Sequence, residues 1–561
     1  MARCPGYEEG SHRYGRARNP GPGTYIRRMR KSFAVTLGAI GLAHSLGAQP
    51  SRGVGSVRFE TSCAPTTQPT FVRAVALLHS FEFGDATKAF NDVLATDSTC
   101  AMAYWGIALS SWGNPFAAGN KGEAQLQRGL VAIDRGRALK SGSERERGFL
   151  DAAAKLFDNY KSTDQRTRVI AYRDALGALA ARYPRDDEAA IFSALAIAFA
   201  ADPNDKSYKD QHKAGAILKP IAARQPNHPG IAHYLIHTYD IPALADEGLP
   251  AANRYATIAP ASAHAQHMPS HTFTRVGQWN ESVAANTRSA KAALDEGSVA
   301  EALHASDYMM YAYLQTGHDT AAARVLAGLP SLAERFDPNA VGSAAPPAAG
   351  FFAMAAIPAR YAIERGDWKR AAALTVRASA FPFTDAISWF ARGIGAARSG
   401  DTTLAAESVR QLQRLHDVLT EKKEVYWSQQ VEIQRRGVDA WLTWARGSKS
   451  AAITAMRQAT EMEAATEKNA MTPGPLLPAR EMLGEMLLAN GDGKAALREF
   501  EQTLEVEPRR FRALAGAMSA ATTVGDNAAA RRYARQIAQI CEGGDRPGRP
   551  ELARAREVAA R

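Results

Sequence analysis

Aromatic residues and cysteines are scarce in this sequence, and the usual signatures of catalytic sites are missing. Of 561 residues, 8% are aromatic and four are cysteines, while 46% are hydrophobic. The sequence contains no Gly-x-Ser-x-Gly, no phosphate-binding loop, no dinucleotide fingerprint, no Cys-x-x-Cys and no His-Glu-x-x-His. The residues therefore identify no catalytic set of a familiar class, and they do not mark the protein as an enzyme.

More than half of the excess of basic over acidic residues lies in the first 48 residues. The formal net charge is +11, but residues 1–48 alone hold eight basic and two acidic residues. The excess that remains is spread over more than 500 residues. A groove that neutralises phosphates needs a concentrated basic surface. We therefore expect no nucleic-acid partner.

The first fifty residues lack a run long enough to span a membrane, but they have the layout of a secretory signal. Basic residues at 27–31 precede an uncharged apolar run at 33–43, and small residues follow before Gln49. The run begins so soon after Met29 that we expect translation to start there, with residues 1–48 forming a leader plus signal peptide. A buried N-terminal helix is the alternative. The signal predicts an exported protein, periplasmic or secreted, with no membrane span in its mature chain.

Cys63 and Cys100 flank the first predicted helical pair, whereas Cys4 and Cys541 lie near the ends of the chain. In an oxidising compartment this pair can form a disulfide. A loop of this size corresponds to roughly 3 to 4 kcal/mol of stabilisation in the chain-entropy model. Two unrelated thiols are the alternative.

From about residue 70 onward the sequence consists of successive amphipathic helices, with no sustained strand-like alternation. Gly-Asp turns recur at a fixed spacing, because Gly366 and Gly400 are 34 residues apart and so are Gly491 and Gly525. This is the period of the tetratricopeptide repeat (TPR), a helix-turn-helix unit. The chain is therefore predicted to be all-α, a right-handed α-solenoid of TPR-like helix-turn-helix repeats.

The segment from Leu483 follows the TPR pattern closely, with Gly484, Ala496, Phe500 and Pro508 at the expected positions. The strings HYLIHTYD, HMPSHTFTRVGQW and MTPGPLLPAREMLGEMLL resemble a group of exported bacterial TPR proteins of uncharacterised activity. This resemblance implies the repeat fold and export, and it implies no particular chemistry.

These patterns predict the organisation of the chain. After the leader we expect an N-terminal linker at 49–70 and a first solenoid half with a His-rich groove at 71–336. A break rich in Pro and Gly at 337–350 then leads to a second solenoid half at 351–541, and 542–561 is expected to be a flexible tail.

Seven of the thirteen histidines fall between His228 and His304. His233 and His237 are four residues apart on a predicted helix, so they share one face. His267 and His271 occupy the same positions one repeat of 34 residues later. Because equivalent positions of adjacent repeats stack side by side, these four imidazoles are predicted to form one patch of candidate metal ligands.

Further polar residues fall on the same predicted face. Counting back from the turn glycines places His264, His304, Asp307 and Tyr311 on the inner face of the first helix of their repeats. Peptide-binding members of the TPR family use this face for their ligands. We therefore expect these residues to line a solvent-facing, concave groove beside the patch.

Two functional hypotheses follow from this arrangement. In the first, the protein is an exported TPR scaffold that binds a protein or peptide in its groove, where the histidines form hydrogen bonds. In the second, the histidine patch binds a divalent transition metal such as zinc, copper, nickel or iron, with an unknown metal-dependent activity. Plain structural packing of the histidines is the remaining alternative. His79 has no histidine neighbour in sequence, and we interpret it as a core or groove residue.

Overall fold

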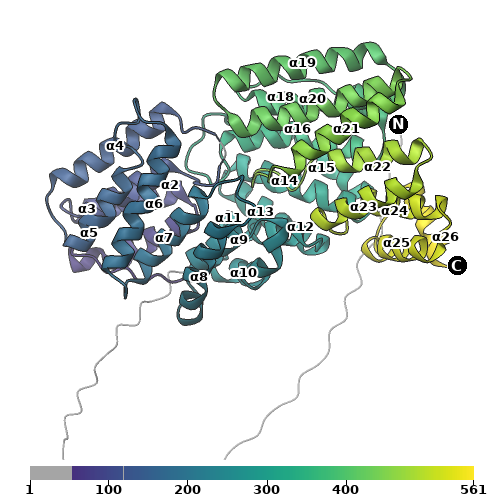
Figure 1. The fold of residues 1–561 in the computed structure, drawn as a ribbon. Helices are drawn as coiled ribbons and strands as arrows, with labels where there is room; N and C mark the ends of the chain where they lie inside the picture. Colours follow the sequence, from purple (N-terminus) through teal and green to yellow (C-terminus); the bar gives the residue numbers. More distant parts are fainter. Residues whose placement is uncertain (1–52, 118) are drawn as a thin grey trace, which may run out of the picture. The chain divides into compact units, whose positions relative to one another are not determined.

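A computed structural model describes residues 53–117 and 119–561, and within these ranges the chain forms α-helices and no β-strand (Figure 1). The predicted signal peptide and start at Met29 lie outside the described residues. The first part of the chain forms η1 (Pro65–Thr67), α1 (Gln68–His79), α2 (Phe83–Thr96), α3 (Ala101–Trp112), α4 (Glu123–Ala138), α5 (Glu144–Ala154), α6 (Gln165–Arg182), α7 (Asp187–Ala200), α8 (Lys209–Arg224), α9 (Pro229–Thr238), η2 (Pro242–Leu244), α10 (Ala245–Ile258), α11 (Ala263–His267), α12 (Pro269–Arg275) and α13 (Trp279–Asp295).

The second part of the chain continues the same succession of helices. These are α14 (Val299–Gln315), α15 (Asp319–Arg335), α16 (Pro347–Glu364), α17 (Trp368–Ala372), α18 (Pro382–Ser399), α19 (Thr402–Glu421), α20 (Val425–Ala445), α21 (Lys449–Ala464), α22 (Ala479–Ala489), α23 (Gly493–Val506), α24 (Phe511–Thr523), α25 (Asn527–Ile540) and α26 (Pro550–Ala559).

Each helix packs mainly against the helices next to it in sequence. The pairs α13 and α14, α18 and α19, and α24 and α25 are in extensive contact, and α18, α19 and α20 lie side by side (Figure 1). Each unit buries its apolar face only by stacking on its neighbours, as expected for a repeat protein. The predicted all-α solenoid of TPR-like helix-turn-helix repeats is confirmed.

The Gly-Asp turns explain why the repeat period is visible in the sequence. Gly400 ends α18 in the left-handed conformation, with φ of 87°, and Gly491 and Gly525 have φ of 86° and 78°. Glycine adopts this conformation without a steric penalty. The aspartate that follows then caps the next helix; the Asp401 side chain, for example, accepts a hydrogen bond from the backbone N–H of Leu404 at 2.9 Å.

Small residues allow the helices of the last repeats to approach one another. A Cβ atom added to Gly484 would lie 2.9 Å from the ring of Phe500, and one added to Gly516 would lie 2.4 Å from it. The Phe500 ring therefore fills the space that these two glycines leave between α22, α23 and α24.

The hydrophobic core does not divide at the predicted break, 337–350. One buried cluster runs from Val54 to Phe273 and includes Ala344, whereas a second runs from Trp279 to Val558. Residues 336–346 do form an irregular segment between α15 and α16. However, Ala344 is 2% exposed, and α14 packs directly against α16. The segment therefore covers the core instead of separating two halves.

Both ends of the described chain are packed more firmly than the sequence suggested. Within 542–561, α26 packs against α24 and α25, and Leu552 is fully buried. Within 49–70, Val57 and Phe59 are each only 1% exposed. The predictions of a flexible tail and of an N-terminal linker are therefore wrong for these residues. Terminal elements of this kind cover apolar repeat faces that would otherwise meet water.

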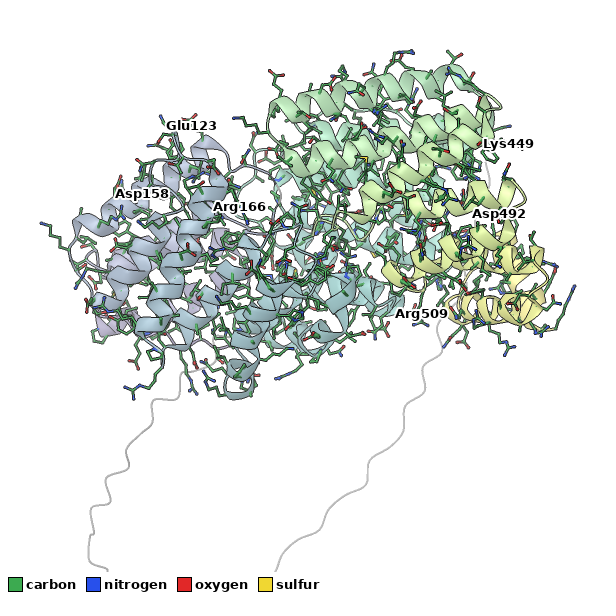
Figure 2. All side chains as sticks on the ribbon, in the orientation of Figure 1. Glu123, Asp158, Arg166, Lys449, Asp492 and Arg509 are labelled. Carbon is green, nitrogen blue, oxygen red and sulfur yellow. A yellow bond between two sulfur atoms is a disulfide. The ribbon has the colours of Figure 1, made fainter. Side chains whose placement is uncertain are left out.

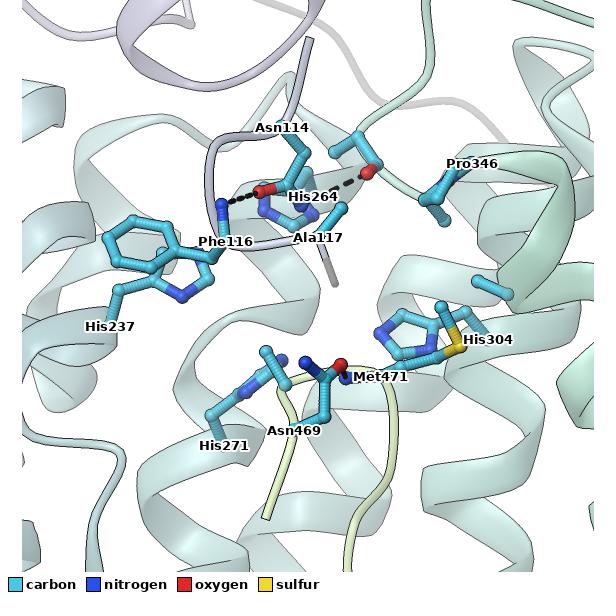
Figure 3. Close-up of a pocket in the computed structure, with 14 residues that line it drawn as sticks. Asn114, Phe116, Ala117, His237, His264, His271, His304, Pro346, Asn469 and Met471 are labelled. Carbon is cyan, nitrogen blue, oxygen red and sulfur yellow. Dashed lines mark hydrogen bonds between the residues drawn. The ribbon is translucent and has the colours of Figure 1, made fainter. Parts of the chain in front are cut away.

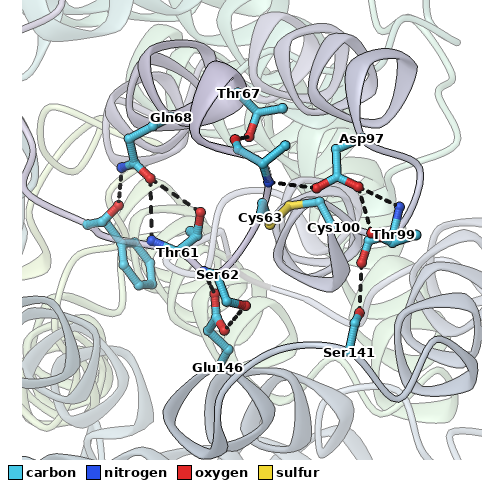
Figure 4. Close-up of a disulfide and its surroundings, with 12 residues drawn as sticks. Thr61, Ser62, Cys63, Thr67, Gln68, Asp97, Thr99, Cys100, Ser141 and Glu146 are labelled. Carbon is cyan, nitrogen blue, oxygen red and sulfur yellow. Dashed lines mark hydrogen bonds between the residues drawn. A yellow bond between two sulfur atoms is a disulfide. The ribbon is translucent and has the colours of Figure 1, made fainter.

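The predicted disulfide between Cys63 and Cys100 is present, with Cα atoms 5.0 Å apart (Figure 4). The backbone N–H that follows Cys63 donates to Asp97 at 2.8 Å. The backbone N–H and the hydroxyl of Ser62 donate to the Glu146 carboxylate at 2.7 and 2.6 Å. The bridge and these hydrogen bonds hold the N-terminal segment against the first helices.

Charged side chains of both signs lie on the surface of the helices, among them Glu123, Arg166 and Lys449 (Figure 2). In the part of the chain that the structure describes, no helix combines the length and the apolar character needed to cross a membrane.

Candidate metal centre

Four helices bring the predicted histidines together. His233 and His237 lie on α9, and His304 lies on α14. Between them in sequence, α11 and α12 carry His264, His267 and His271. α9 packs against α12, and α11 packs against α14. α11 and α12 are separate helices because Pro269 has no backbone N–H with which to continue the hydrogen-bond ladder.

These six histidines are buried, so their predicted placement in a solvent-facing groove is wrong. Their exposed fractions range from 0% for His233 to 8% for His237. The segments 114–117, 344–346 and 469–471 cover them, and residues of these segments line a cavity of about 30 Å³ together with His237, His264, His271 and His304 (Figure 3). A cavity of this size has room for about one small molecule the size of water.

His233, His237 and His264 form a first triad, in which one ring nitrogen of each lies within 4.8 Å of the others. Nδ1 of His233 donates to the carbonyl oxygen of His79 at 2.7 Å, and Nδ1 of His264 donates to the Glu301 carboxylate at 2.9 Å. Since neither oxygen carries a proton, the proton of each imidazole is on Nδ1. The Nε2 atoms of all three histidines are buried and have no hydrogen-bond partner among the described residues.

His267, His271 and His304 form a second triad with the same spacing. Nδ1 of His267 donates to Oδ1 of Asn286 at 2.7 Å, and Nδ1 of His271 donates to Oδ2 of Asp240 at 2.9 Å. The amide nitrogen of Asn286 donates to a carbonyl of its own helix, so its oxygen faces His267. Since the proton of each neutral ring is on Nδ1, the Nε2 atoms of His267 and His271 both carry lone pairs. These two atoms lie 3.0 Å apart.

Burial keeps most of these imidazoles neutral. It lowers the pKa of His233, His237 and His267 well below the usual value, and it lowers the pKa of His271 in the same direction. Burial also lowers the pKa of His304 to about 3. Neighbouring imidazoles add to the effect, because a charge on one ring disfavours a charge on the next. Neutral imidazole is the form that binds metal ions.

Asp307 and Tyr311 do not face these imidazoles and do not line an open groove. Asp307 accepts a hydrogen bond from Nε of Arg360 at 2.8 Å, and the two side chains are 1% and 0% exposed. The hydroxyl of Tyr311 accepts one from Arg510 at 3.0 Å. Both residues belong to a buried network of ion pairs that joins α14 to α16 and to the segment before α24.

The sequence did not identify the residues that orient the imidazoles. Asp240 accepts from Arg275 at 3.0 Å and from Lys468 at 2.9 Å, in addition to His271. Burial alone would raise the pKa of Asp240, but the two cations hold it well below its usual range. The one available signal was the position of Asp240, three residues after His237. Lys468 lies 228 residues away, where no local pattern points to the site.

A third buried group, His79, Glu188 and His228, has metal-ligand spacing but a different use of its nitrogens. Nε2 of His79 and Nε2 of His228 both donate to the Glu188 carboxylate, at 3.0 and 2.8 Å. Nδ1 of His79 accepts from the hydroxyl of Tyr234 at 2.8 Å. The nitrogens that face the carboxylate therefore carry protons, and this group is a hydrogen-bonded network around Glu188 and not a ligand set.

No family model matches the sequence, and no curated protein matches it. Solved structures with some similarity include the APC/C hetero-tetramer Cut9-Hcn1, with 12% identity over 88% of this chain and 89% of that chain and a TM-score of 0.33. The human IFIT1 dimer with m7Gppp-AAAA shows 10% identity over 74% of this chain and 87% of that chain, with a TM-score of 0.34. Naa15/Naa10 bound to HypK-THB shows 10% identity over 88% and 92%, with a TM-score of 0.23. These similarities are too low to indicate a ligand for this chain.

Proposed function

We propose that this protein binds first-row transition-metal ions at a buried histidine cluster, which consists of His233, His237, His264, His267, His271 and His304. The pair of Nε2 atoms of His267 and His271, 3.0 Å apart, carries the proposal. Two lone pairs at this distance repel each other unless a cation lies beside both. A metal ion that binds nitrogen at about 2.0–2.1 Å with a bond angle near 90° places its ligands about 3 Å apart.

A shared proton is the other way to relieve this repulsion, and the surroundings disfavour it. A proton here would create a buried imidazolium next to several other imidazoles, and burial lowers the pKa of His267 and His271. A metal ion binds neutral imidazoles, so it would relieve the repulsion without a proton on either ring. The geometry and the charge environment therefore favour the metal.

The hydrogen bonds of the Nδ1 atoms support the same proposal. In metal sites the ligating histidine usually donates its other N–H to a carboxylate or carbonyl, which fixes the ring and the tautomer. His233, His264 and His271 make these bonds to a carbonyl and two carboxylates. If the cluster served packing alone, its buried Nε2 atoms would be expected to have hydrogen-bond partners.

The donor types restrict the metals. Among the residues that the structure describes, the cluster offers six imidazoles and no thiolate or carboxylate. Imidazole suits zinc, copper, nickel and iron, whereas magnesium and calcium prefer oxygen ligands. The cluster therefore matches the divalent transition metals expected from the sequence.

A peptide in an open groove fits the histidines less well. The covering segments 114–117, 344–346 and 469–471 lie between the cluster and solvent, so a peptide would have to displace them to reach the imidazoles. In this proposal the repeat scaffold serves to position the metal ligands. A protein partner, if one binds, would use other surfaces of the scaffold.

Export remains part of the proposal. Its support is the secretory layout at 27–48 together with the disulfide between Cys63 and Cys100, since structural disulfides are rare in reducing compartments. A protein in the periplasm or outside the cell would meet metal ions that are not buffered by the cytosol.

Metal analysis tests this function directly. The exported protein, purified without a histidine tag and dialysed after incubation with zinc or copper, is expected to keep at least one equivalent of metal per chain. The double variant H267N/H271N is expected to lose metal from its triad. H212N changes an exposed histidine on α8 and serves as the matched control, with unchanged metal content.

Two results would overturn the proposal. One is wild-type protein that keeps less than about a tenth of an equivalent after dialysis. The other is a folded H267N/H271N variant with the metal content of the wild type. If the double variant does not fold, H237N changes the least buried member of the cluster, at 8% exposed, and is measured in its place.

A further inference from the structure

The two triads lie as close to each other as their own members do. Across the triads, the ring centroids of His237 and His271 are 5.8 Å apart. Within the first triad, His237 and His264 are 6.4 Å apart, and within the second, His271 and His304 are 6.3 Å apart. If each triad holds one ion, the two ions are therefore neighbours and not separate sites.

The cavity of about 30 Å³ lies between the triads, since His237 and His264 from one and His271 and His304 from the other line it (Figure 3). The rest of its lining is mostly apolar and comes from residues 114–117, 344–349 and 469–471. The amides of Asn114 and Asn469 accept hydrogen bonds from backbone N–H groups of their own segments, at 2.9 Å each. In the described part of the chain, the imidazoles are the only titratable side chains that line the cavity.

Among the described residues, no side chain is placed to bridge two ions in the two triads. The carboxylates nearest the cluster are Asp240 and Glu301, and both accept from Nδ1 of a histidine, on the side of the ring away from Nε2. Carboxylate-bridged pairs of iron or manganese use glutamate among their ligands. A bridging ligand at this centre must therefore come from outside and fit a small, mostly apolar cavity.

We infer that the two triads hold a pair of copper ions, one in each triad, and that the cavity between them takes dioxygen as a shared ligand. This inference rests on the proposed function. Copper forms the strongest complexes with nitrogen donors among the divalent metals of this series. Zinc has no redox chemistry, and a two-zinc hydrolytic site would need space for a polar substrate. A neutral diatomic molecule fits the cavity and its uncharged walls.

Dioxygen binding requires no reactant other than the two copper(I) ions. Two copper(I) ions each give up one electron, and dioxygen takes up both electrons and stays between the two copper(II) ions with its oxygen–oxygen bond intact. No proton moves and no group leaves. Release of dioxygen returns one electron to each ion.

The test uses the exported protein loaded with copper(I) under anaerobic conditions. We expect two copper ions per chain and uptake of one dioxygen per two copper ions on exposure to air. After exposure to air this protein should show an electron paramagnetic resonance signal well below that of two isolated copper(II) ions, because the bound dioxygen bridges the two ions and couples their spins. Azide, a small probe of the bridging position, should change the absorption of the copper(II) protein at one azide per two copper ions.

A cavity-filling variant separates the bridging site from the metal ligands. Ala349, on α16, is 2% exposed and lines the cavity. A349V keeps all six histidines, so it should bind two copper ions but lose most of the dioxygen uptake and the azide response. A348V changes the neighbouring residue, which does not line this cavity, and should behave as the wild type.

The outcomes separate this inference from the proposed function. A single copper ion per chain, or two ions without dioxygen uptake or spin coupling, would overturn the paired centre and leave metal binding intact. Unchanged dioxygen uptake and azide response in A349V would overturn the cavity as the bridging site. A protein that binds no metal would remove both proposals.

Discussion

Lys468 and Asp240 form a buried ion pair, with Nζ of Lys468 2.9 Å from Oδ2 of Asp240. The same carboxylate oxygen accepts from Nδ1 of His271, also at 2.9 Å. Lys468 lies in the segment 465–478 between α21 and α22, and the next residues of this segment, 469–471, line the cavity. A covering segment and a proposed metal ligand thus share one carboxylate.

Asp240 is expected to strengthen metal binding by orienting His271. The variant D240N removes the charge but keeps the size of the side chain. Loss of such a partner typically lowers metal affinity 10- to 100-fold, and we expect a decrease in this range, measured by competition with a chelator. D92N, on the exposed surface of α2, is the control and should leave the affinity unchanged. An unaltered affinity in folded D240N would show that this carboxylate does not act on the metal.

Lys468 is expected to keep the covering segment closed. In K468M the segment loses its ion pair with Asp240, so hydrogen exchange in 465–478 should rise and a chelator should remove the metal several-fold faster. K206M is a matched control, because Lys206 pairs with Glu467 of the same segment but is 38% exposed. Equal release rates in K468M and wild-type protein would contradict a closing role for Lys468.

The repeat architecture could be predicted because its signals are local. A glycine with positive φ and a capping aspartate mark each turn, and the period of 34 residues then relates distant helices. The same period placed His267 one repeat after His233, and the structure brings both into the histidine cluster. The repeat period thus related the histidines of neighbouring repeats, but it did not show that they are buried.

The burial of the cluster could not be predicted, because it depends on segments without a period. Residues 114–117 and 469–471 are far from the histidines in sequence and follow no repeat pattern. The segment 337–350 was predicted to be a break rich in Pro and Gly. A linker between two halves and a loop that packs over a core have the same composition, so the sequence did not distinguish them. The partners of His79 were hidden for a similar reason, since Glu188 lies 109 residues away.

The disulfide is expected to stabilise the protein without affecting the metal. Replacing Cys63 and Cys100 by serine should lower the free energy of unfolding by about 4 kcal/mol, the chain-entropy value for a loop of this length, as measured by denaturant titration. Metal content should not change.

In native wild-type protein, neither Cys63 nor Cys100 should react with iodoacetamide before reduction. Cys541 should stay unlabelled because burial raises the pKa of its thiol to about 12. Rapid labelling of Cys63 in unreduced protein would contradict the bridge.

Glu188 is expected to make the stability of the protein depend on pH under acidic conditions. Burial alone would raise the pKa of this carboxyl, but His228 and His79 outweigh it and lower the pKa to about 2, from the usual 4.5. A carboxylate whose pKa is lower in the folded state stabilises the fold fully above pH 4.5, and this contribution is lost as pH falls towards 2.

The size of this effect follows from the shift. The lowering of the Glu188 pKa from 4.5 to about 2 corresponds to roughly 3 kcal/mol. The free energy of unfolding of E188Q at pH 6 should therefore be lower than that of the wild type by about that amount. At pH 3 the difference between the two proteins should be clearly smaller, because part of the wild-type stabilisation has been lost. Urea titrations followed by circular dichroism at both pH values measure the two differences. E123Q, which changes an exposed carboxylate on α4, should show little change at either pH. If the free energies of unfolding of E188Q and wild-type protein differ by the same amount at pH 6 and pH 3, the ionised Glu188 is not the source of the stabilisation. The network with His79 and His228 must then be held by hydrogen bonds alone.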